Sequence, residues 1–294
     1  NAVDWRDSNA DVPALADIEP NAKPAVLVEA AAAEVTREVA DVNWDGVMQA
    51  TKAALKADPL NVRALSLLGL SLQADNQPEA AEQAMTDAAA RSLRNPLPHL
   101  WLYNTFLQQR AYARAFSHAD VVLRAQPEFS VSVFLSFGEL AVEPTAFKQL
   151  VLELEKNPPW RARFLTWLAR DPDSAPRSAA LIAELQQGKT PPRSNELMPV
   201  LNQLIAAKDY DEAFFLWLRS LPEDKFASLD YLPNGDFGLA ITDLPFDWSL
   251  KPTPGADISV VSTAGAEEAL RVQFYAGRVP FRGVRKLLVL PPGR

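Results

Sequence analysis

The chain of 294 residues contains no cysteine and only two histidines. Without cysteine there are no disulfides, no thiolate metal sites and no cysteine nucleophiles. Two histidines are too few for a metal centre built from several imidazoles. The sequence also lacks a run of about 18 apolar residues, so we expect no membrane-spanning segment in this chain. These absences predict that the chain holds no metal and needs no cofactor.

Positive charge is also scarce. The 29 Lys and Arg residues are outnumbered by 37 Asp and Glu residues, which gives a net charge of −8. This balance argues against nucleic acid as a partner, because nucleic-acid binding depends on cations that displace counterions from phosphates. The hydrophobic fraction of 48% and the charged fraction of 22% are typical of a folded globular protein.

Glycine-rich catalytic motifs are missing as well. Gly188-Lys189-Thr190 has the ending of a phosphate-binding loop, but Ala183 occupies the position of the required first glycine. The sequence contains neither a dinucleotide-binding glycine fingerprint nor a Gly-x-Ser-x-Gly nucleophile elbow. We therefore name no catalytic residues and predict that the chain is not an enzyme.

What the chain does contain is an internal repeat with an offset of 34 residues. At this offset Leu68 aligns with Leu102, and Ala81 aligns with Ala115. Apolar residues recur every three or four positions on each side of residues 74–78, which form a turn signal ending in proline. This pattern predicts pairs of amphipathic helices joined by short turns.

The residues Leu68-Gly69, Ala81 and Ala88, with Pro59 closing the preceding unit, resemble the tetratricopeptide repeat (TPR). Small residues allow the two helices of a unit to approach closely, and a proline cannot continue a helix. The resemblance is clearest over residues 60–95, 96–128 and 196–222, and a worn unit covers residues 24–57. It implies a mainly α fold, a TPR-like α-solenoid of helix-turn-helix repeats, whose groove holds a partner protein.

Residues 129–190 keep the rhythm of helix pairs but lose the signature. Gly138 is expected to interrupt the first of their helices. We expect four helices in this region, at Phe129–Leu140, Pro144–Lys156, Trp160–Ala169 and Ser174–Gln187.

Aromatic residues on these helices are candidates for the groove. Trp101 neighbours an apolar helix face and is expected to project into the groove, with His99 and Tyr103 beside it. Core packing is the alternative for Tyr103 and for most other aromatic residues of the helices. We expect His99 and His118 to face the solvent or the groove, because nothing in the sequence pairs them with a catalytic partner.

The sequence changes character near residue 225, where short alternating runs replace the helical pattern. Strands are predicted at Ile258–Val261, Leu270–Phe274 and Arg285–Leu290. The charge changes too: residues 231–294 hold seven Lys/Arg and six Asp/Glu, a net of +1, which leaves −9 for the remainder.

This C-terminal segment is similar to the start of a carbohydrate-binding jelly-roll module. The similarity lies in Leu232–Phe237, Phe246–Trp248, Ala269–Val272 and Leu288–Gly293, although Gly238 replaces the usual acidic residue. It implies a partial β-sandwich. The resulting domain prediction is an extended N-terminal arm at 1–23, the solenoid at 24–224 and the partial β-sandwich at 225–294.

The similarity also suggests where a sugar would bind. Arg271, Gln273 and Tyr275 alternate with apolar residues, so they are expected on the outer face of a sheet. An exposed aromatic ring can stack on a sugar while polar neighbours bind its hydroxyls, and we name these three residues as candidate glycan contacts, together with Trp248. The alternatives are a solvated sheet face for the first three and a packing role for Trp248.

These features predict a non-enzymatic scaffold of bacterial cell-envelope polysaccharide assembly or secretion, which binds a partner protein and a glycan. We expect it in the periplasm, or anchored in a membrane and facing the periplasm, with the cytoplasm as the alternative. The start at Asn1 and the end at Arg294 suggest a processed chain or a fragment. Two other functions stay open. One is an adaptor whose β segment only caps the solenoid, and the other is an enzyme accessory or a glycoside-active fragment whose catalytic part lies outside this sequence.

Overall fold

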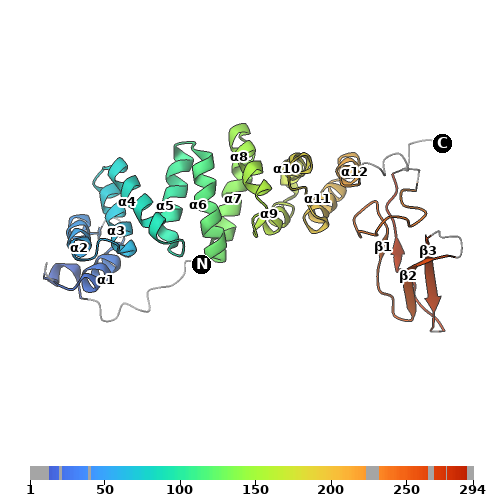
Figure 1. The fold of residues 1–294 in the computed structure, drawn as a ribbon, viewed down its shortest axis with the longest axis horizontal. Helices are drawn as coiled ribbons and strands as arrows, with labels where there is room; N and C mark the ends of the chain where they lie inside the picture. The colour runs from blue at the N-terminus through green and yellow to red at the C-terminus, as the bar shows by residue number, and fades with distance from the viewer. Residues whose placement is uncertain are drawn as a thin grey trace. The chain divides into compact units, whose positions relative to one another are not determined.

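The computed structural model describes residues 13–19, 22–38, 41–222, 232–263, 268–275 and 277–289. Contacts divide the chain into two compact units, Asn1–Val133 and Phe134–Arg294. Both units are built mainly from paired helices, so the mainly α, TPR-like fold class is confirmed (Figure 1). In the part of the chain that the structure describes, no helix has the length and apolar character needed to cross a membrane.

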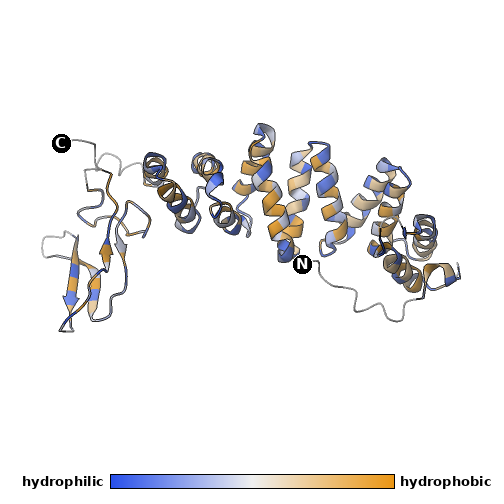
Figure 2. Cartoon of the chain, turned by 180° about the vertical axis from the view of Figure 1, so that it is seen from behind, coloured by the Kyte–Doolittle hydropathy of each residue, from blue (hydrophilic) through white to orange (hydrophobic). Residues whose placement is uncertain are grey.

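In the first unit, consecutive helices pack against one another in pairs, α1 with α2, α3 with α4, and α5 with α6 (Figure 1). Apolar residues gather on the sides where the helices meet (Figure 2). The helices are α1 (Pro24–Val35), α2 (Trp44–Ala57), α3 (Val62–Ala74), α4 (Pro78–Arg91), α5 (Pro96–Gln108) and α6 (Tyr112–Ala125), with short 3-10 helices η2 (Leu15–Asp17) and η4 (Pro127–Phe129).

Asparagine side chains begin three of these helices. Asn43, Asn61 and Asn95 accept hydrogen bonds from backbone N–H groups in the first turns of α2, α3 and α5, at 3.0, 3.0 and 3.2 Å. An asparagine at this position satisfies a donor that the helix itself leaves unpaired. The sequence therefore marks the start of these helices locally, before any tertiary contact forms.

The close approach expected between paired helices is present between α3 and α4. A Cβ atom added to Gly69 would lie 2.9 Å from both Cγ and Cε of Met85, which is tighter than real contacts allow. Ala81 and Ala88, on the same side of α4, are fully buried. Small residues in these positions let the two helix backbones come together, as the TPR resemblance implies.

The predicted N-terminal arm is only partly described. Its residues 13–19 contain η2, and Leu15 of η2 and the following Ile18 pack on a core cluster of α1 and α2 that includes Leu27 and Ala50. This part of the arm is therefore docked on the first helix pair and covers apolar surface there. Residues 1–12 of the predicted arm lie outside the described residues.

One turn geometry recurs within the helix pairs. The second residue after the helix has a positive φ of 56° at Asn76, 56° at Arg110 and 63° at Lys208. At Arg110, the N–H donates to the carbonyl of Leu107, and the next N–H, of Ala111, donates to the carbonyl of Phe106. These two bonds form a Schellman motif, which satisfies the last carbonyls of the helix. The same pair of bonds closes α3 and α11.

The second unit contains the four helices predicted for residues 129–190, within one or two residues at most ends (Figure 1). Its helices are α7 (Ser130–Leu140), which begins in the first unit, α8 (Pro144–Glu155), α9 (Arg161–Leu168), α10 (Ala175–Gln187), α11 (Ser194–Ala206) and α12 (Tyr210–Leu218), with the short 3-10 helix η5 (Pro172–Ser174). Phe134, Phe137, Trp160 and Phe164 form an aromatic core, in which the rings of Phe137 and Phe164 meet edge to face at 5.7 Å.

The expectation that Gly138 interrupts a helix is wrong, because α7 continues through it to Leu140. A Cβ atom at Gly138 would lie 3.4 Å from Leu168 and 3.5 Å from Trp167. These are ordinary van der Waals distances, so α9 packs beside Gly138 without requiring a glycine at this position.

The C-terminal segment holds two small antiparallel sheets among its described residues. β1 (Ser249–Leu250) pairs with β4 (Val284–Arg285), and β2 (Ala256–Ser262) pairs with β3 (Glu268–Phe274). The predicted strands at 258–261 and 270–274 are present. The third is wrong in extent, because the described residues 286–289 are not in a strand. Two two-stranded sheets do not reproduce the jelly roll that the resemblance implied.

Aromatic contacts join this segment to the last helix pair of its unit. The ring of Phe246, which is buried, meets Phe214 edge to face at 5.4 Å and lies 5.9 Å from Trp217. Both partners are on α12. Phe246 therefore covers apolar surface at the end of the helical array.

Candidate functional site

Two of the three predicted groove residues are buried. His99 is 3% exposed and Tyr103 is 4% exposed, and both lie on α5 with their side chains in the interior of the first unit. The prediction that these two residues contact a partner is therefore corrected, because helix packing covers their side chains. Tyr103 packs in the core, which was the alternative expected for it.

Trp101 is half-buried and does not project freely. Its indole packs against a small cluster formed by Leu72, Ala81 and Ala84 of the preceding helix pair. Only the remaining edge of the ring is open to a partner. Further exposed surface on α5 comes from Asn104, while Leu97 and Leu100 are partly exposed. Sequence reasoning missed Asn104, although it lies three residues after Trp101 and hence on a neighbouring part of the helix surface.

His99 and His118 form a direct pair between α5 and α6. Their Nδ1 atoms are 3.0 Å apart, and Nε2 of His99 lies 3.2 Å from the carbonyl oxygen of Ser92. A carbonyl can only accept, so His99 carries its hydrogen on Nε2 and its Nδ1 accepts from His118. The expectation that both face the solvent or the groove is wrong for His99, which is buried. His118 is half-buried, and its Nδ1 is engaged by His99.

The surroundings of this pair disfavour positive charge. Burial, together with smaller effects of the neighbouring His99 and Arg114, lowers the pKa of His118 to about 4. Burial also lowers the pKa of His99, against a smaller opposing effect of its bond to Ser92. Both imidazoles are thus neutral at pH 7, and a neutral His99 is what its role as hydrogen-bond acceptor requires.

Trp248, a candidate glycan contact, has a packing role. Its ring stacks on Phe237 with centroids 5.0 Å apart, and its Nε1 donates to the carbonyl of Asn234 at 2.6 Å. The ammonium of Lys286 lies 4.8 Å from the ring centroid, and burial lowers the pKa of that lysine. The indole is therefore engaged by the segment itself, and we correct its assignment as a glycan contact.

The other three glycan candidates lie on one face of the β2–β3 hairpin. Arg271 pairs with Ser259 across the ladder, Gln273 pairs with Asp257, and Tyr275 follows at the end of the strand. Their side chains are exposed, and the ring of Tyr275 is 72% exposed. Arg271 lies 3.9 Å from the carboxylate of Asp257 and 3.3 Å from the hydroxyl of Ser259.

A hollow of about 540 Å³ lies beside Tyr275. Its walls bring a phenol, an amine, a hydroxyl and a carboxylate close to apolar surface. The lining residues are Leu250, Lys251, Pro252, Thr253, Pro254, Ala256, Asp257, Ile258 and Tyr275. The backbone N–H of Tyr275 donates to the carbonyl of Gly255 at 3.0 Å, which fixes the start of its side chain at the rim. We name these nine residues the Tyr275 hollow.

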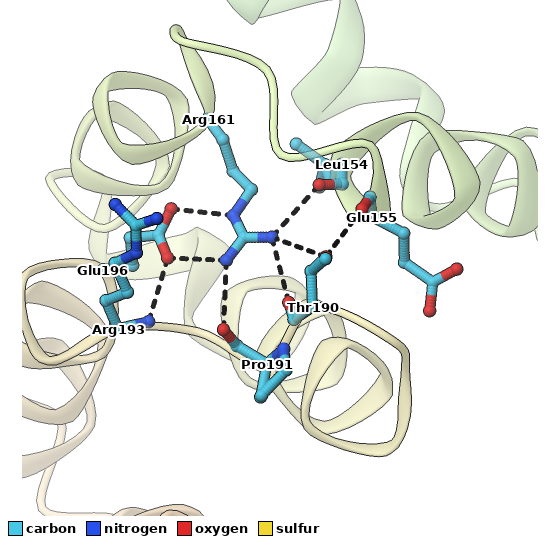
Figure 3. Close-up of polar contacts among 7 residues, drawn as sticks. All are labelled: Leu154, Glu155, Arg161, Thr190, Pro191, Arg193 and Glu196. Carbon is cyan, nitrogen blue, oxygen red and sulfur yellow. Dashed lines mark hydrogen bonds and ion pairs between the residues drawn. The ribbon is translucent and has the colours of Figure 1, made fainter.

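A buried ion pair in the second unit is structural. The guanidinium of Arg161 donates to both carboxylate oxygens of Glu196, at 2.7 and 2.6 Å (Figure 3). Its remaining hydrogens reach the carbonyls of Leu154, Thr190 and Pro191 at 3.0–3.3 Å. Figure 3 shows Leu154, Thr190, Pro191 and Glu196 converging on this one side chain.

The charge of Glu196 is stabilised in this cluster. Burial raises the pKa of its carboxyl, but hydrogen bonds from Arg161 and from the backbone N–H of Arg193 prevail and hold it below its ordinary value. Every donor of Arg161 that points inward has an acceptor, so the cluster offers no group to a ligand. It links the end of α8, the start of α9 and the connection into α11. Across the described ranges, no group of three or more potential ligand side chains that could hold a metal ion was found.

No protein-family model matches the chain, and no curated protein matches its sequence. Solved structures with a similar arrangement include PilF of Pseudomonas aeruginosa, at 17% identity and a TM-score of 0.32, over 67% of this chain and 89% of that one. Two structures of MamA are also similar. The first is 15% identical with a TM-score of 0.31, over 74% of this chain and 97% of that one. The second is 15% identical with a TM-score of 0.28, over 66% and 99%. Such low values assign no family to the chain.

Proposed function

We propose that this chain is a non-enzymatic scaffold of bacterial cell-envelope polysaccharide assembly or secretion. Its paired helices bind a partner protein, and its C-terminal segment contacts a glycan. The observation that carries the glycan role is the ring of Tyr275, which is 72% exposed at the rim of a hollow containing several hydrogen-bonding groups. Aromatic rings bury large areas on contact, and the hydroxyl of tyrosine adds a polar contact. The periplasm is the proposed location.

A glycan array probed with the intact protein tests this role. Tyr275→Ala removes the ring and is expected to lose at least tenfold in affinity. Tyr210→Ala is the matched control, because Tyr210 is also an exposed tyrosine but lies on α12. Equal binding by the two variants, or no binding of any glycan by the unaltered protein, would contradict the glycan role.

The proposed protein partner binds the exposed part of α5. A photo-crosslinking amino acid at Asn104 is expected to capture a component of the polysaccharide export machinery in cells. The control site is Thr86, which is exposed on α4 of the same unit. Capture of the same protein from both sites, or from neither, would argue against a specific partner surface on α5.

The adaptor with a capping β segment is the second candidate. The packing of Phe246 on Phe214 and Trp217 favours it, because the ends of helical repeat arrays need their apolar faces covered. If capping is the segment's only role, Phe246→Ala lowers stability and Tyr275→Ala changes no binding. Loss of glycan binding in Tyr275→Ala at unchanged stability would contradict the hypothesis that the C-terminal segment acts only as a cap.

A further inference from the structure

We infer that the Tyr275 hollow takes an anionic polysaccharide, one whose sugars carry carboxylates. The inference rests on the proposed glycan role and specifies the class of polymer. It comes from the distribution of unpaired positive charge around the hollow, in a chain whose net charge is −8.

Positive charge is concentrated in the described residues 277–289. They contain Arg278, Arg282, Arg285 and Lys286 and no carboxylate. Lys286 is engaged internally, since its ammonium donates to the carbonyl of Pro233 and lies over the ring of Trp248. The three arginines are exposed, and none has an ion-pair partner within the described part of the chain.

Backbone contacts place one of these arginines next in sequence to a residue that packs on the hollow's lining. Arg282 precedes Gly283, whose carbonyl accepts from the backbone N–H of Lys251 at 2.7 Å. A Cβ atom at Gly283 would lie 2.5 Å from Oγ1 of Thr253 and closer still to Cδ1 of Ile258, so this backbone packs against two lining residues. The exposed Arg282 is its immediate neighbour, with its Cα about 3.8 Å from that of Gly283.

Arg278 is close along the chain to Tyr275, which lines the hollow. It follows Tyr275 by three residues, and consecutive Cα atoms are about 3.8 Å apart, so its Cα lies within about 11 Å of that of Tyr275. A long, flexible side chain starting there can reach a polymer stacked on the ring. Arginine suits this task, because its planar guanidinium can bind a carboxylate through two parallel hydrogen bonds.

The negative charges near the hollow are already matched. Asp257 lies 3.9 Å from Arg271, and Asp243 lies 3.8 Å from Lys251. These pairs are exposed and hold their partners weakly. What remains uncompensated is the charge of the arginines, and the polymer that fits it is one with regularly spaced carboxylates.

The test compares matched polymers with the intact protein. Polygalacturonate, alginate and hyaluronate are each paired with a carboxyl-reduced form, which keeps the sugar backbone and removes the charge. We expect the protein to bind at least one anionic polymer at least tenfold more tightly than its reduced form. This preference is expected to fall as NaCl rises from about 20 to 300 mM, because salt screens exposed charges.

Variants then assign the preference to the hollow. Arg278→Gln/Arg282→Gln is expected to lose about tenfold in affinity for the anionic polymer and to leave binding of the reduced form unchanged. Arg163→Gln/Arg219→Gln removes two exposed arginines elsewhere in the same unit and is expected to bind as the unaltered protein does. An equal loss in both double variants would overturn the inference, because it would reflect net charge alone.

The possible failures are distinguishable. Equal binding of the charged and reduced polymers would overturn the anionic preference and leave the glycan role standing. Failure to bind any polymer of either kind would overturn both. Tyr275→Ala connects the two proposals. Because it removes the stacking ring, it is expected to weaken binding of the anionic polymer and of its reduced form equally.

Discussion

His118 donates its Nδ1 hydrogen to Nδ1 of His99 across 3.0 Å, between two helices of the first unit. Protonation of His99 at Nδ1 would place two N–H groups face to face and break this bond. Because His99 also donates to the carbonyl of Ser92, the pair joins the entry of α5 to α6. The hydrogen bond between the rings therefore depends on His99 staying neutral.

Acid is expected to destabilise the protein through this pair. The pKa of His118 is about 4 when folded and near 6.5 when unfolded, so the unfolded state binds more protons between these values. The contribution to stability is complete above pH 6.5, declines as the pH falls towards 4 and then levels off. Urea unfolding followed by circular dichroism at pH 7.5, 6, 5 and 4.5 measures this decline.

His99→Gln/His118→Asn supplies the control, since it removes both imidazoles and keeps groups that can form hydrogen bonds. Its stability is expected to decline less over the same range. An identical decline in the variant would assign the effect to carboxylates.

The buried ion pair predicts an asymmetric response to mutation. Arg161→Met leaves the carboxylate of Glu196 buried without its main partner, and the expected loss is about 3–5 kcal/mol of unfolding free energy. Arg161→Met/Glu196→Gln removes both charges and is expected to recover a large part of the loss. Arg163→Met, at an exposed neighbour, is the control. Chemical denaturation measures all three, and a double variant less stable than Arg161→Met would refute the argument.

Gly69 is expected to tolerate no side chain. Gly69→Ala places a methyl group against Met85 and is expected to cost about 1–3 kcal/mol, because overpacking displaces neighbours in a close-packed interior. Gly277→Ala is the matched control, since a Cβ there would meet nothing within 4 Å. Thermal unfolding compares the two. A neutral Gly69→Ala would show that α3 and α4 do not require this close approach.

Phe246 is expected to stabilise the last helix pair. Phe246→Ala removes a fully buried ring from Phe214 and Trp217, with an expected cost of about 3 kcal/mol. Phe215→Ala is the control. It removes an exposed ring from α12, the helix that carries Phe214 and Trp217, and is expected to have little effect on stability. Tryptophan fluorescence during denaturation reports on the site through Trp217. Equal stabilities would mean that the C-terminal segment does not cap α12.

Much of the helical fold is predictable because its signals are local. Asn61 marks the start of α3, and the spacing of Leu68, Gly69 and Ala81 identifies a close helix pair. The β2–β3 alternation is equally local, since side chains in a strand point to opposite faces in turn. The continuation of α7 through Gly138 has no local signal, because the neighbours of this residue, Trp167 and Leu168, lie on another helix.

The buried polar contacts could not be predicted from the sequence. His99 and His118 are 19 residues apart, and Arg161 and Glu196 are 35 residues apart, so each pair forms only when separate helices pack. Single-sequence patterns also place charged residues at the surface by default, where most of them belong. Trp248 illustrates the same limit, because its partner Lys286 comes from the far end of the segment.

Glycine substitutions in the positive-φ turns that close α5 and α11 are expected to raise the melting temperature of the protein. Arg110 and Lys208 adopt a backbone conformation that favours glycine, and both side chains are exposed. Glycine at either position would relieve a cost on the order of 1 kcal/mol. Arg110→Gly and Lys208→Gly together are thus expected to stabilise the protein for binding assays. They change no residue of α5, of the β2–β3 hairpin or of residues 277–289.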